Sequence, residues 1–243
     1  MNHNIAIVTG ASRGIGRAIA LRYAKEGYHL AICCKNNSSA LEDTAREIRS
    51  LGVDCLTYQG DMGNAVQVEE FFAKVRETFH TVHVLVNNAG ISHIGLMQDL
   101  KEDVWQEILS SNLSSAFFCC QKAIPFMLQN GAGKIINISS VWGQTGASTE
   151  VAYSTTKGGI NALTKALAKE LAPSNIQVNA IACGLIDTDM NSCFSEEEIS
   201  TLIEEIPAGR IGTPEEVAGL AFSLSKEHNY LTGQVISLDG GWI

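Results

Sequence analysis

The sequence is poor in positive charge and in long apolar runs. Lysine and arginine number 17 against 26 acidic residues, so the formal net charge is -9, which excludes a nucleic-acid-binding surface and attraction to anionic membranes. No apolar run approaches the roughly 20 residues that cross a bilayer, and the first residues show no export signal. We therefore expect a soluble, cytoplasmic protein without a membrane partner, acting on a small or neutral molecule.

Signatures of disulfides, metal sites and linkers are missing as well. The seven cysteines include two adjacent pairs but no C-x-x-C, which is typical of reduced, buried thiols in a cytosolic protein. The six histidines show no metal-ligand spacing, so we expect no metal site. Only four prolines occur, and no low-complexity tract or internal repeat divides the chain.

The sequence does contain a regular alternation of short apolar runs and longer amphipathic stretches over its 243 residues. This alternation predicts βα units around a parallel sheet. Strands are expected near residues 4–9, 29–34, 54–59, 82–87, 133–139, 175–181 and 234–238, and helices near 14–26, 38–51, 64–79, 101–129, 151–172 and 214–225. We predict a single α/β domain over residues 1–243 with a Rossmann-type, doubly wound, seven-stranded parallel sheet.

Two stretches depart from this regularity. Pro125 lies inside the long helical pattern at 101–129, so a bend or break is expected near Ala123. Residues 184–212 lack a clean strand, and an insertion of that size is either a functional lid or a disordered excursion. We favour a mobile helical lid. The negative charge gathers there, because residues 191–217 hold seven acids against one base.

A glycine-rich turn follows the first strand, with Gly10, Gly14 and Gly16 before a helical pattern. Glycines at such a turn let backbone N–H groups approach a pyrophosphate at the positive end of a helix, where a Cβ would intrude. The spacing is G-x-x-x-G-x-G, and its place after the first strand favours a dinucleotide site over an ordinary turn.

The end of the second strand indicates which dinucleotide binds. An acidic residue there would hold the ribose 2′-hydroxyl of NAD, but this strand is followed by Lys35 and no acid. Lys35 and Arg13 can supply two positive charges to a 2′-phosphate, each contact being worth about 1.5–3 kcal/mol. We expect NADP(H) as the cofactor. The alternative is that both residues are solvated surface charges.

Tyr153 and Lys157 are four residues apart in a predicted helix, so they share one face. A nearby ammonium lowers the pKa of a phenol from its reference of about 10, which would make Tyr153 a usable proton donor near neutrality. The Y-x-x-x-K spacing is common by chance, but Ser140 at a strand end and Asn112 accompany it. Together with the glycine turn, they favour a catalytic site over an ordinary surface helix.

On these motifs the chain resembles the classical short-chain dehydrogenases/reductases over essentially its whole length. The matching motifs are Thr9-Gly10-x3-Gly14-x-Gly16, Asn87-Asn88-Ala89-Gly90, Asn112, Ser139-Ser140, Tyr153-x3-Lys157, Thr232-Gly233-Gln234 and Asp239-Gly240-Gly241. The chain is most similar to the 3-oxoacyl-[acyl-carrier-protein] reductases. The resemblance implies a homotetramer that uses NADPH to reduce a ketone to a secondary alcohol, here a 3-oxoacyl thioester.

The resemblance also implies a role for each matching residue. Tyr153 would protonate the carbonyl oxygen, and Ser140 would hydrogen-bond that oxygen. Lys157 would bind the nicotinamide ribose, while the backbone of Asn112 would hold a water that links Lys157 to solvent. The implied cofactor contacts are Gly10, Ser12, Arg13, Gly14, Ile15, Gly16, Lys35, Asp61, Met62, Asn88, Ala89, Gly90, Tyr153, Lys157, Ile186 and Thr188.

Two features depart from the family pattern. The loop after the sixth strand reads Cys183-Gly184 in place of Pro-Gly, and Cys183 is either a reactive thiol near the cofactor or, more simply, an inert small residue. Carrier-protein reductases commonly have arginines beside the pocket before strands five and six, whereas Lys134 is the nearest base here. This departure and the acidic lid argue against an acidic acyl carrier protein as partner.

The substrate side is less well defined by sequence. By their position His93, Trp142 and Gln144, with Met97, are candidates for the substrate pocket, and ordinary core or rim packing is the alternative. Two other functions stay open. One is the same chemistry on a free ketone or alcohol such as a hydroxysteroid or sugar, and the other is a non-catalytic, cofactor-binding regulatory protein, which the complete catalytic motif disfavours.

Overall fold

Seven parallel strands form one sheet in the computed structural model, which describes residues 4–191 and 194–243. The strand order is β3-β2-β1-β4-β5-β6-β7, so the chain winds outward in two directions from β1 and β4. The strands are β1 (Ile5–Thr9), β2 (His29–Cys34), β3 (Cys55–Gln59), β4 (Val84–Asn87), β5 (Gly133–Ser140), β6 (Ile176–Cys183) and β7 (Val235–Leu238). The predicted doubly wound sheet is confirmed, each strand to within two residues.

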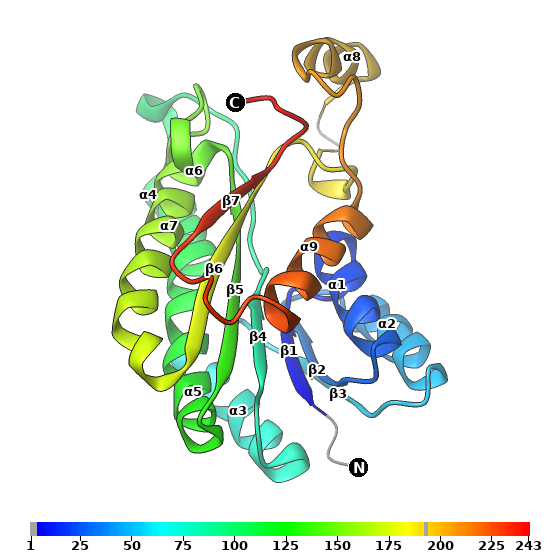
Figure 1. Cartoon of the computed structure of the whole chain (residues 1–243). Helices are drawn as coiled ribbons and strands as arrows, with labels where there is room; N and C mark the ends of the chain where they lie inside the picture. Colours follow the sequence, from blue (N-terminus) through cyan, green and yellow to red (C-terminus); the bar gives the residue numbers. More distant parts are fainter. Residues whose placement is uncertain (1–3, 192–193) are drawn as a thin grey trace.

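Helices cover both faces of the sheet (Figure 1). One face carries α1 (Gly14–Lys25), α2 (Ser38–Ser50) and α9 (Pro214–Lys226), and the other carries α3 (Ala65–Phe79), α5 (Ser115–Asn130) and α7 (Val151–Leu171). The shorter elements are α4 (Glu102–Leu109), α6 (Trp142–Thr145), α8 (Glu196–Glu205) and the 3-10 turns at Met97–Asp99, Ala172–Ser174 and Asp189–Asn191. This three-layer arrangement buries the sheet on both sides.

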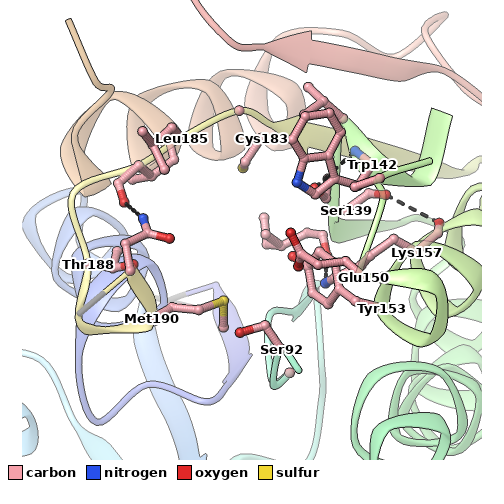
Figure 2. Close-up of a pocket in the computed structure, with 18 of the residues that line it drawn as sticks. Ser92, Ser139, Trp142, Glu150, Tyr153, Lys157, Cys183, Leu185, Thr188 and Met190 are labelled. Atoms are coloured by element: carbon pink, nitrogen blue, oxygen red, sulfur yellow. Dashed lines mark hydrogen bonds between the residues drawn. The ribbon is translucent and has the colours of Figure 1, made fainter. Parts of the chain in front are cut away.

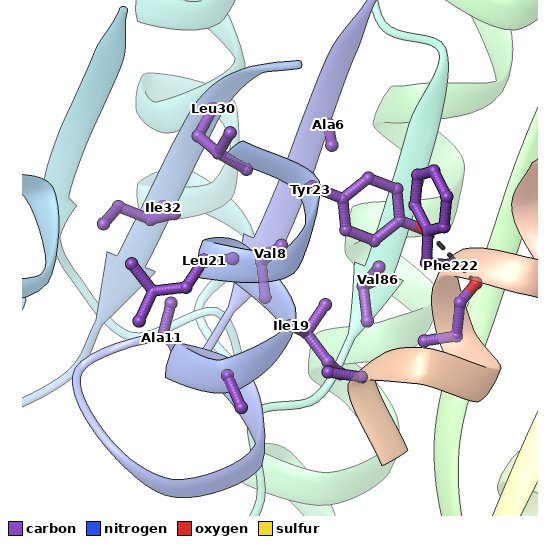
Figure 3. Packing of buried hydrophobic residues seen from close by; sticks show 14 of the residues in the cluster. Ala6, Val8, Ala11, Ile19, Leu21, Tyr23, Leu30, Ile32, Val86 and Phe222 are labelled. Atoms are coloured by element: carbon purple, nitrogen blue, oxygen red, sulfur yellow. Dashed lines mark hydrogen bonds between the residues drawn. The ribbon is translucent and has the colours of Figure 1, made fainter. Parts of the chain in front are cut away.

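Apolar packing fixes α1 and α9 on their face of the sheet. Every residue of β1 is buried, as expected of a strand covered on both faces. Tyr23 of α1 packs edge-on against Phe222 of α9 with ring centroids 5.4 Å apart (Figure 3). The Tyr23 hydroxyl donates to Ser225 Oγ at 2.7 Å, so the buried phenol is satisfied. Truncating Phe222 to alanine would cost about 3–5 kcal/mol.

The long helical pattern at 101–129 is interrupted, but not near Ala123, where an interruption was expected. Helix α5 runs on through Pro125, so the predicted break is wrong, while a bend there stays a prediction. Pro125 and Gln121 are both exposed, and water can therefore bond the Gln121 carbonyl that the proline leaves without a helical partner. The interruption lies instead at Ser110–Ser114, a π-helical turn between α4 and α5.

The carboxyl ends of β1, β4, β5 and β6 meet at one edge of the sheet. The strand order reverses between β1 and β4, and such a switch point opens the crevice in which open α/β sheets bind ligands. Figure 1 shows α8 at this same end of the molecule, close to the C-terminus. The fold thus brings residues from distant parts of the chain to one edge.

The segment at 184–212 leaves this edge and returns to it. Its two ends are joined by backbone hydrogen bonds, from Gly212 N to the Leu185 carbonyl and from Asp187 N to the Gly212 carbonyl, each 2.9 Å. Helix α8 begins with a reciprocal capping box between Ser195 and Glu198. The helical character expected of this segment is confirmed at Asp189–Asn191 and in α8, while residues 192–193 lie outside the described residues. Its mobility stays a prediction.

Within residues 4–191 and 194–243, no helix is long and apolar enough to cross a membrane. The same residues contain no group of three or more histidine, cysteine, aspartate or glutamate side chains able to hold a metal ion. The six cysteines among them are free thiols.

Candidate active site

Two adjoining cavities occupy the edge where the strands end. The first, of about 480 Å³, is lined by Gly10, Ser12, Arg13, Gly14, Ile15, Gly16, Lys35, Asp61, Met62, Asn88, Ala89, Gly90 and Thr188. The second, of about 500 Å³, is lined by the other predicted cofactor contacts, Tyr153, Lys157 and Ile186. Ile15, Asn88, Gly90, Thr188 and Met190 border both cavities. The structure therefore brings together every residue that the sequence assigned to the cofactor.

The glycine-rich turn packs its backbone closely against neighbouring atoms. Gly10 has a positive φ of 65°, and a Cβ on Gly16 would lie 2.2 Å from the Gly10 carbonyl oxygen and 2.4 Å from Asn88 Nδ2. Asn88 Nδ2 donates to the carbonyls of Thr9 and Gly10, which ties this turn to the end of β4. The residue before α1, Arg13, makes no side-chain cap. The first N–H groups of α1 thus suit a pyrophosphate.

The two bases expected at a 2′-phosphate both line the first cavity and are both paired with acids. Lys35 Nζ lies 2.9 Å from Asp61 and 3.4 Å from Glu107. Arg13 lies 2.8 Å from Asp189. Hydrogen bonding to Asp61 raises the pKa of Lys35, so this ammonium is charged at neutral pH. A 2′-phosphate here would have to compete with carboxylates for both bases.

Three of the four predicted catalytic side chains line the second cavity. Ser140 ends β5, and Tyr153 and Lys157 project from the first turns of α7 on one side of the pocket (Figure 2). Lys157 Nζ donates to the Ile138 carbonyl at 2.8 Å and lies 5.5 Å from the centre of the Tyr153 ring. The i, i+4 spacing in α7 and the end of β5 thus place a hydroxyl, a phenol and an ammonium around one space.

Burial dominates the protonation of this group. Desolvation raises the pKa of Tyr153, a hydrogen bond with Ser140 opposes that rise, and electrostatic interactions with Cys183 and then Glu150 add to it. The net lowering of the phenol pKa that was expected from Lys157 is not found, because burial outweighs the other influences and the Lys157 ammonium donates to the Ile138 carbonyl. Burial also lowers the pKa of Lys157 itself to about 8. Tyr153 is consequently a protonated phenol at neutral pH.

Asn112, the fourth predicted residue, lies behind the pocket rather than in its wall. It belongs to the π-helical turn, a feature that is frequent at functional sites. Its Oδ1 accepts from Ile91 N at 2.8 Å, and its Nδ2 donates to the Ile91 carbonyl at 2.9 Å and to Thr156 Oγ1 at 3.1 Å. The side chain therefore fixes the loop after β4 against α7, next to Lys157.

Of the four residues expected in the substrate pocket, only Trp142 lines the second cavity. Its backbone N–H donates to Ser140 Oγ at 3.2 Å. His93 does not line it, although Ser92 and Ile94 on either side do. Gln144 is exposed and donates to Ser237, and Met97 is 63% exposed at the surface. For these three residues the alternative of rim packing is the better description.

Two residues in the wall of the second cavity were not predicted from the sequence. Glu150 precedes α7, and its position three residues before Tyr153 is a signal that could have drawn attention to it. Trp242 comes from the C-terminal segment, and its ring centre lies 4.9 Å from that of Trp142. Its indole Nε1 also donates to Glu205 of α8 at 3.3 Å. No local sequence pattern predicts that Trp242 lines the pocket, because only the tertiary fold brings it there.

Cys183, which replaces the proline usual in the family, borders the second cavity at the end of β6. Burial raises the pKa of its thiol to about 12. Because the thiolate is the reactive form, these surroundings favour the inert interpretation over the reactive one.

Lys134, which was expected to be the base nearest to the pocket, does not line it. Lys134 lies at the amino end of β5, whereas Ser140 lies at its carboxyl end, about 20 Å away at 3.3 Å per residue. Lys134 donates to Asn229 at 2.9 Å. The turns before β5 and β6 are likewise at the edge opposite to the pocket. Missing arginines there do not bear on the pocket of the same chain.

Comparison with known proteins agrees with this geometry. Residues 4–199 match the family described as short chain dehydrogenase. The chain is 41% identical over 237 residues to the 3-oxoacyl-[acyl-carrier-protein] reductase FabG of Staphylococcus aureus, covering 97% of this chain and 96% of that protein. It is 38% identical over 241 residues to the 3-oxoacyl-[acyl-carrier-protein] reductase of Synechocystis, with 98% and 96% covered.

A solved structure is also similar to this chain in its fold. A putative short-chain alcohol dehydrogenase from Sinorhizobium meliloti superposes with a TM-score of 0.94 at 35% identity, covering 100% of this chain and 97% of that chain. The chain therefore belongs to the short-chain dehydrogenase/reductase family. It is an oxidoreductase of the kind that uses a nicotinamide dinucleotide.

Proposed function

We propose that the protein reduces a 3-oxoacyl thioester to the 3-hydroxyacyl thioester with NADPH. The observation that carries the proposal is the convergence of Ser140, Tyr153 and Lys157 on an apolar pocket that adjoins a cavity with a glycine-rich turn. The 41% identity to a 3-oxoacyl-[acyl-carrier-protein] reductase supports the substrate class.

The reduction divides into a hydride transfer and a proton transfer. The nicotinamide, when bound, supplies the hydride, and this chain's residues manage the oxygen of the substrate. The Tyr153 phenol is protonated at neutral pH and donates its proton to the carbonyl oxygen as negative charge develops there. The Ser140 hydroxyl donates a hydrogen bond to the same oxygen and fixes its position.

Lys157 and Asn112 support this transfer. The Lys157 ammonium holds the nicotinamide ribose and stabilises the tyrosinate that remains after proton donation. Asn112 locks the π-helical turn beside Lys157 through its contacts with Ile91 and Thr156. A π-helical turn shifts the backbone bonding pattern by one residue, which suits a carbonyl that holds a water linking Lys157 to solvent.

Preference for NADPH rests on Lys35 and Arg13 in the first cavity and on the lack of an acid directly after β2.

The segment at 184–212 is proposed as a lid, because it leaves and rejoins the edge of the sheet beside the pocket. A cytoplasmic location and a homotetramer are kept as predictions. Exposed Phe117 and Leu128 on α5 offer apolar surface for assembly, and light scattering on the purified protein would measure it.

The experiment that tests the function is a steady-state comparison of substrates with NADPH and NADH. Acetoacetyl-coenzyme A and its acyl-carrier-protein counterpart would be compared with steroid and sugar ketones. We expect turnover of acetoacetyl-coenzyme A with NADPH, and no turnover of any thioester would refute the proposal. A thioester turned over only without its carrier would remove the carrier protein as partner.

A free ketone or secondary alcohol is the second candidate substrate. The acidic α8 favours it, because glutamates at 196, 197, 198, 204 and 205 stand beside the pocket and would repel an acidic carrier protein. Turnover of a steroid or sugar ketone in place of the thioesters would select this candidate.

A further inference from the structure

One charged side chain in the wall of the second cavity has no part in the proposed chemistry. Glu150 lines the cavity directly before α7, beside Tyr153 (Figure 2). It is the one acidic residue among the described residues that line this cavity, and the only other charged one is Lys157. The Glu150 carboxylate makes no hydrogen bond or ion pair with another described side chain.

The surroundings make this charge effective at the reacting group. Much of the wall is apolar, with Val141, Leu185, Phe194, Leu202 and Trp242 among its residues, and a charge is screened less beside apolar surface than in water. Burial raises the pKa of Glu150, and its charge in turn raises the pKa of Tyr153. The carboxylate therefore acts on the place where the ketone oxygen must bind.

The opposite charge in the cavity does not cancel this effect. The ammonium of Lys157 lies deep, where it donates to the Ile138 carbonyl at 2.8 Å. In the proposed reaction it also serves the cofactor ribose and the tyrosinate. A second anion next to the ketone would consequently meet Glu150 without a cation free to receive it.

We propose that Glu150 is a specificity-determining residue that excludes 3-oxo acids, in which a carboxylate lies one carbon away from the ketone carbonyl. This inference deepens the proposed function and rests on ketone reduction at this site. A 3-oxo ester or thioester is neutral at the position where the free 3-oxo acid carries a negative charge. The pocket would therefore accept the ester or thioester and reject the free acid, since like charges that share a poorly solvated site repel each other.

The test compares ethyl acetoacetate with acetoacetate in wild type, in Glu150→Gln and in Glu77→Gln. The Glu150→Gln substitution keeps size and hydrogen-bonding ability and removes the charge. Glu77 is exposed on α3, outside both cavities, so its substitution removes the same charge elsewhere. The readouts are kcat/KM with NADPH and the dissociation constant of each compound from tryptophan fluorescence, since Trp142 and Trp242 border the pocket.

We expect Glu150→Gln to raise kcat/KM for acetoacetate relative to the ester at least about tenfold, which corresponds to about 1.4 kcal/mol. The dissociation constant of acetoacetate should fall by a similar factor, and that of the ester should change less than about twofold. Glu77→Gln should leave both ratios as in wild type.

Several outcomes would overturn the inference. An unchanged ratio in Glu150→Gln would do so, as would an equal change for both compounds, which would mark a structural role. Absence of binding of either compound to any variant would overturn it as well. If binding follows the expected pattern but neither ethyl acetoacetate nor acetoacetyl-coenzyme A is reduced, the proposed function fails and the role of Glu150 stands.

Discussion

Arg13 of the glycine-rich turn lies 2.8 Å from Asp189, so the cofactor cavity is joined to the segment that leads to α8. Both side chains are 67% exposed, and a pair this exposed contributes at most about 1 kcal/mol. A 2′-phosphate is a stronger, charge-assisted partner for an arginine. Binding of NADPH is thus expected to exchange the partner of Arg13 and to alter the contacts of residues 184–212.

Hydrogen exchange would measure this coupling. Amides of α8 should exchange faster in the free protein than with saturating NADPH, because a closed lid packs against the occupied site. Amides of residues 122–130 in α5, which lead to the amino end of β5 and line neither cavity, serve as the internal control. Equal protection of α8 in both states would argue against gating by this segment.

Tyr153→Phe removes the proposed proton donor and leaves the ring. We expect at least about a hundredfold loss in kcat with an unchanged dissociation constant for NADPH. The matched control is Tyr230→Phe, because Tyr230 is fully exposed and borders neither cavity. Turnover of Tyr153→Phe near the wild-type rate would refute the assignment.

Lys157→Met should change stability with pH. Burial lowers the pKa of Lys157 to about 8 from about 10.4 in the unfolded chain, so between these values the unfolded state binds more protons and wild-type stability rises with pH. The buried ammonium therefore costs most below pH 8. The variant, although inactive, should be up to about 3 kcal/mol more stable than wild type at pH 7 and about 1 kcal/mol at pH 9.5.

Urea unfolding of both proteins at the two pH values would give this difference. Other titrating groups are common to both proteins, so their contributions cancel in the comparison. A stability difference that does not vary with pH would mean that Lys157 is not the source.

Lys35→Asp should move cofactor preference toward NADH. The aspartate would repel a 2′-phosphate and could accept a hydrogen bond from a ribose 2′-hydroxyl. The ratio of kcat/KM for NADPH to that for NADH should fall at least about tenfold, which corresponds to about 1.4 kcal/mol. Lys169→Asp, with the same change of charge at the exposed end of α7, is the control. An unchanged ratio would place the phosphate elsewhere.

Glu107→Gln is expected to act in the opposite direction. Glu107 lies 3.4 Å from Lys35 Nζ, so its removal frees part of that charge for a phosphate. The preference for NADPH should rise by a few fold, since the glutamate is more than half exposed and its interaction is screened. A fall in preference would indicate that Glu107 orients Lys35 rather than competing for it.

The parts of the fold that sequence could predict are those encoded locally. The burial of β1 and the glycines after it follow from neighbouring residues, and so does the shared face of Tyr153 and Lys157. The sheet and the cofactor cavity were therefore predictable. The effect of Pro125 on its helix could not be predicted, because it depends on whether water reaches the Gln121 carbonyl, and packing decides that exposure.

The parts that could not be predicted depend on contacts across the fold. The pKa of Tyr153 follows its burial rather than its sequence distance from Lys157. Trp242 reaches the pocket only because β7 pairs with β6 and directs the following residues over it. Lys134 is only six residues before Ser140 in the sequence, yet β5 carries it to the opposite edge.

The hydrogen bonds between Leu185, Asp187 and Gly212 hold together the two ends of the segment that contains α8. Because these ends lie side by side, the chain enters and leaves the segment at nearly the same place. The length and sequence between these ends can vary with little effect on β6 or α9, since lengthening a surface loop costs little. Substrate range can thus diversify in this scaffold through changes in α8, while Thr188 stays at the two cavities and the catalytic framework is kept.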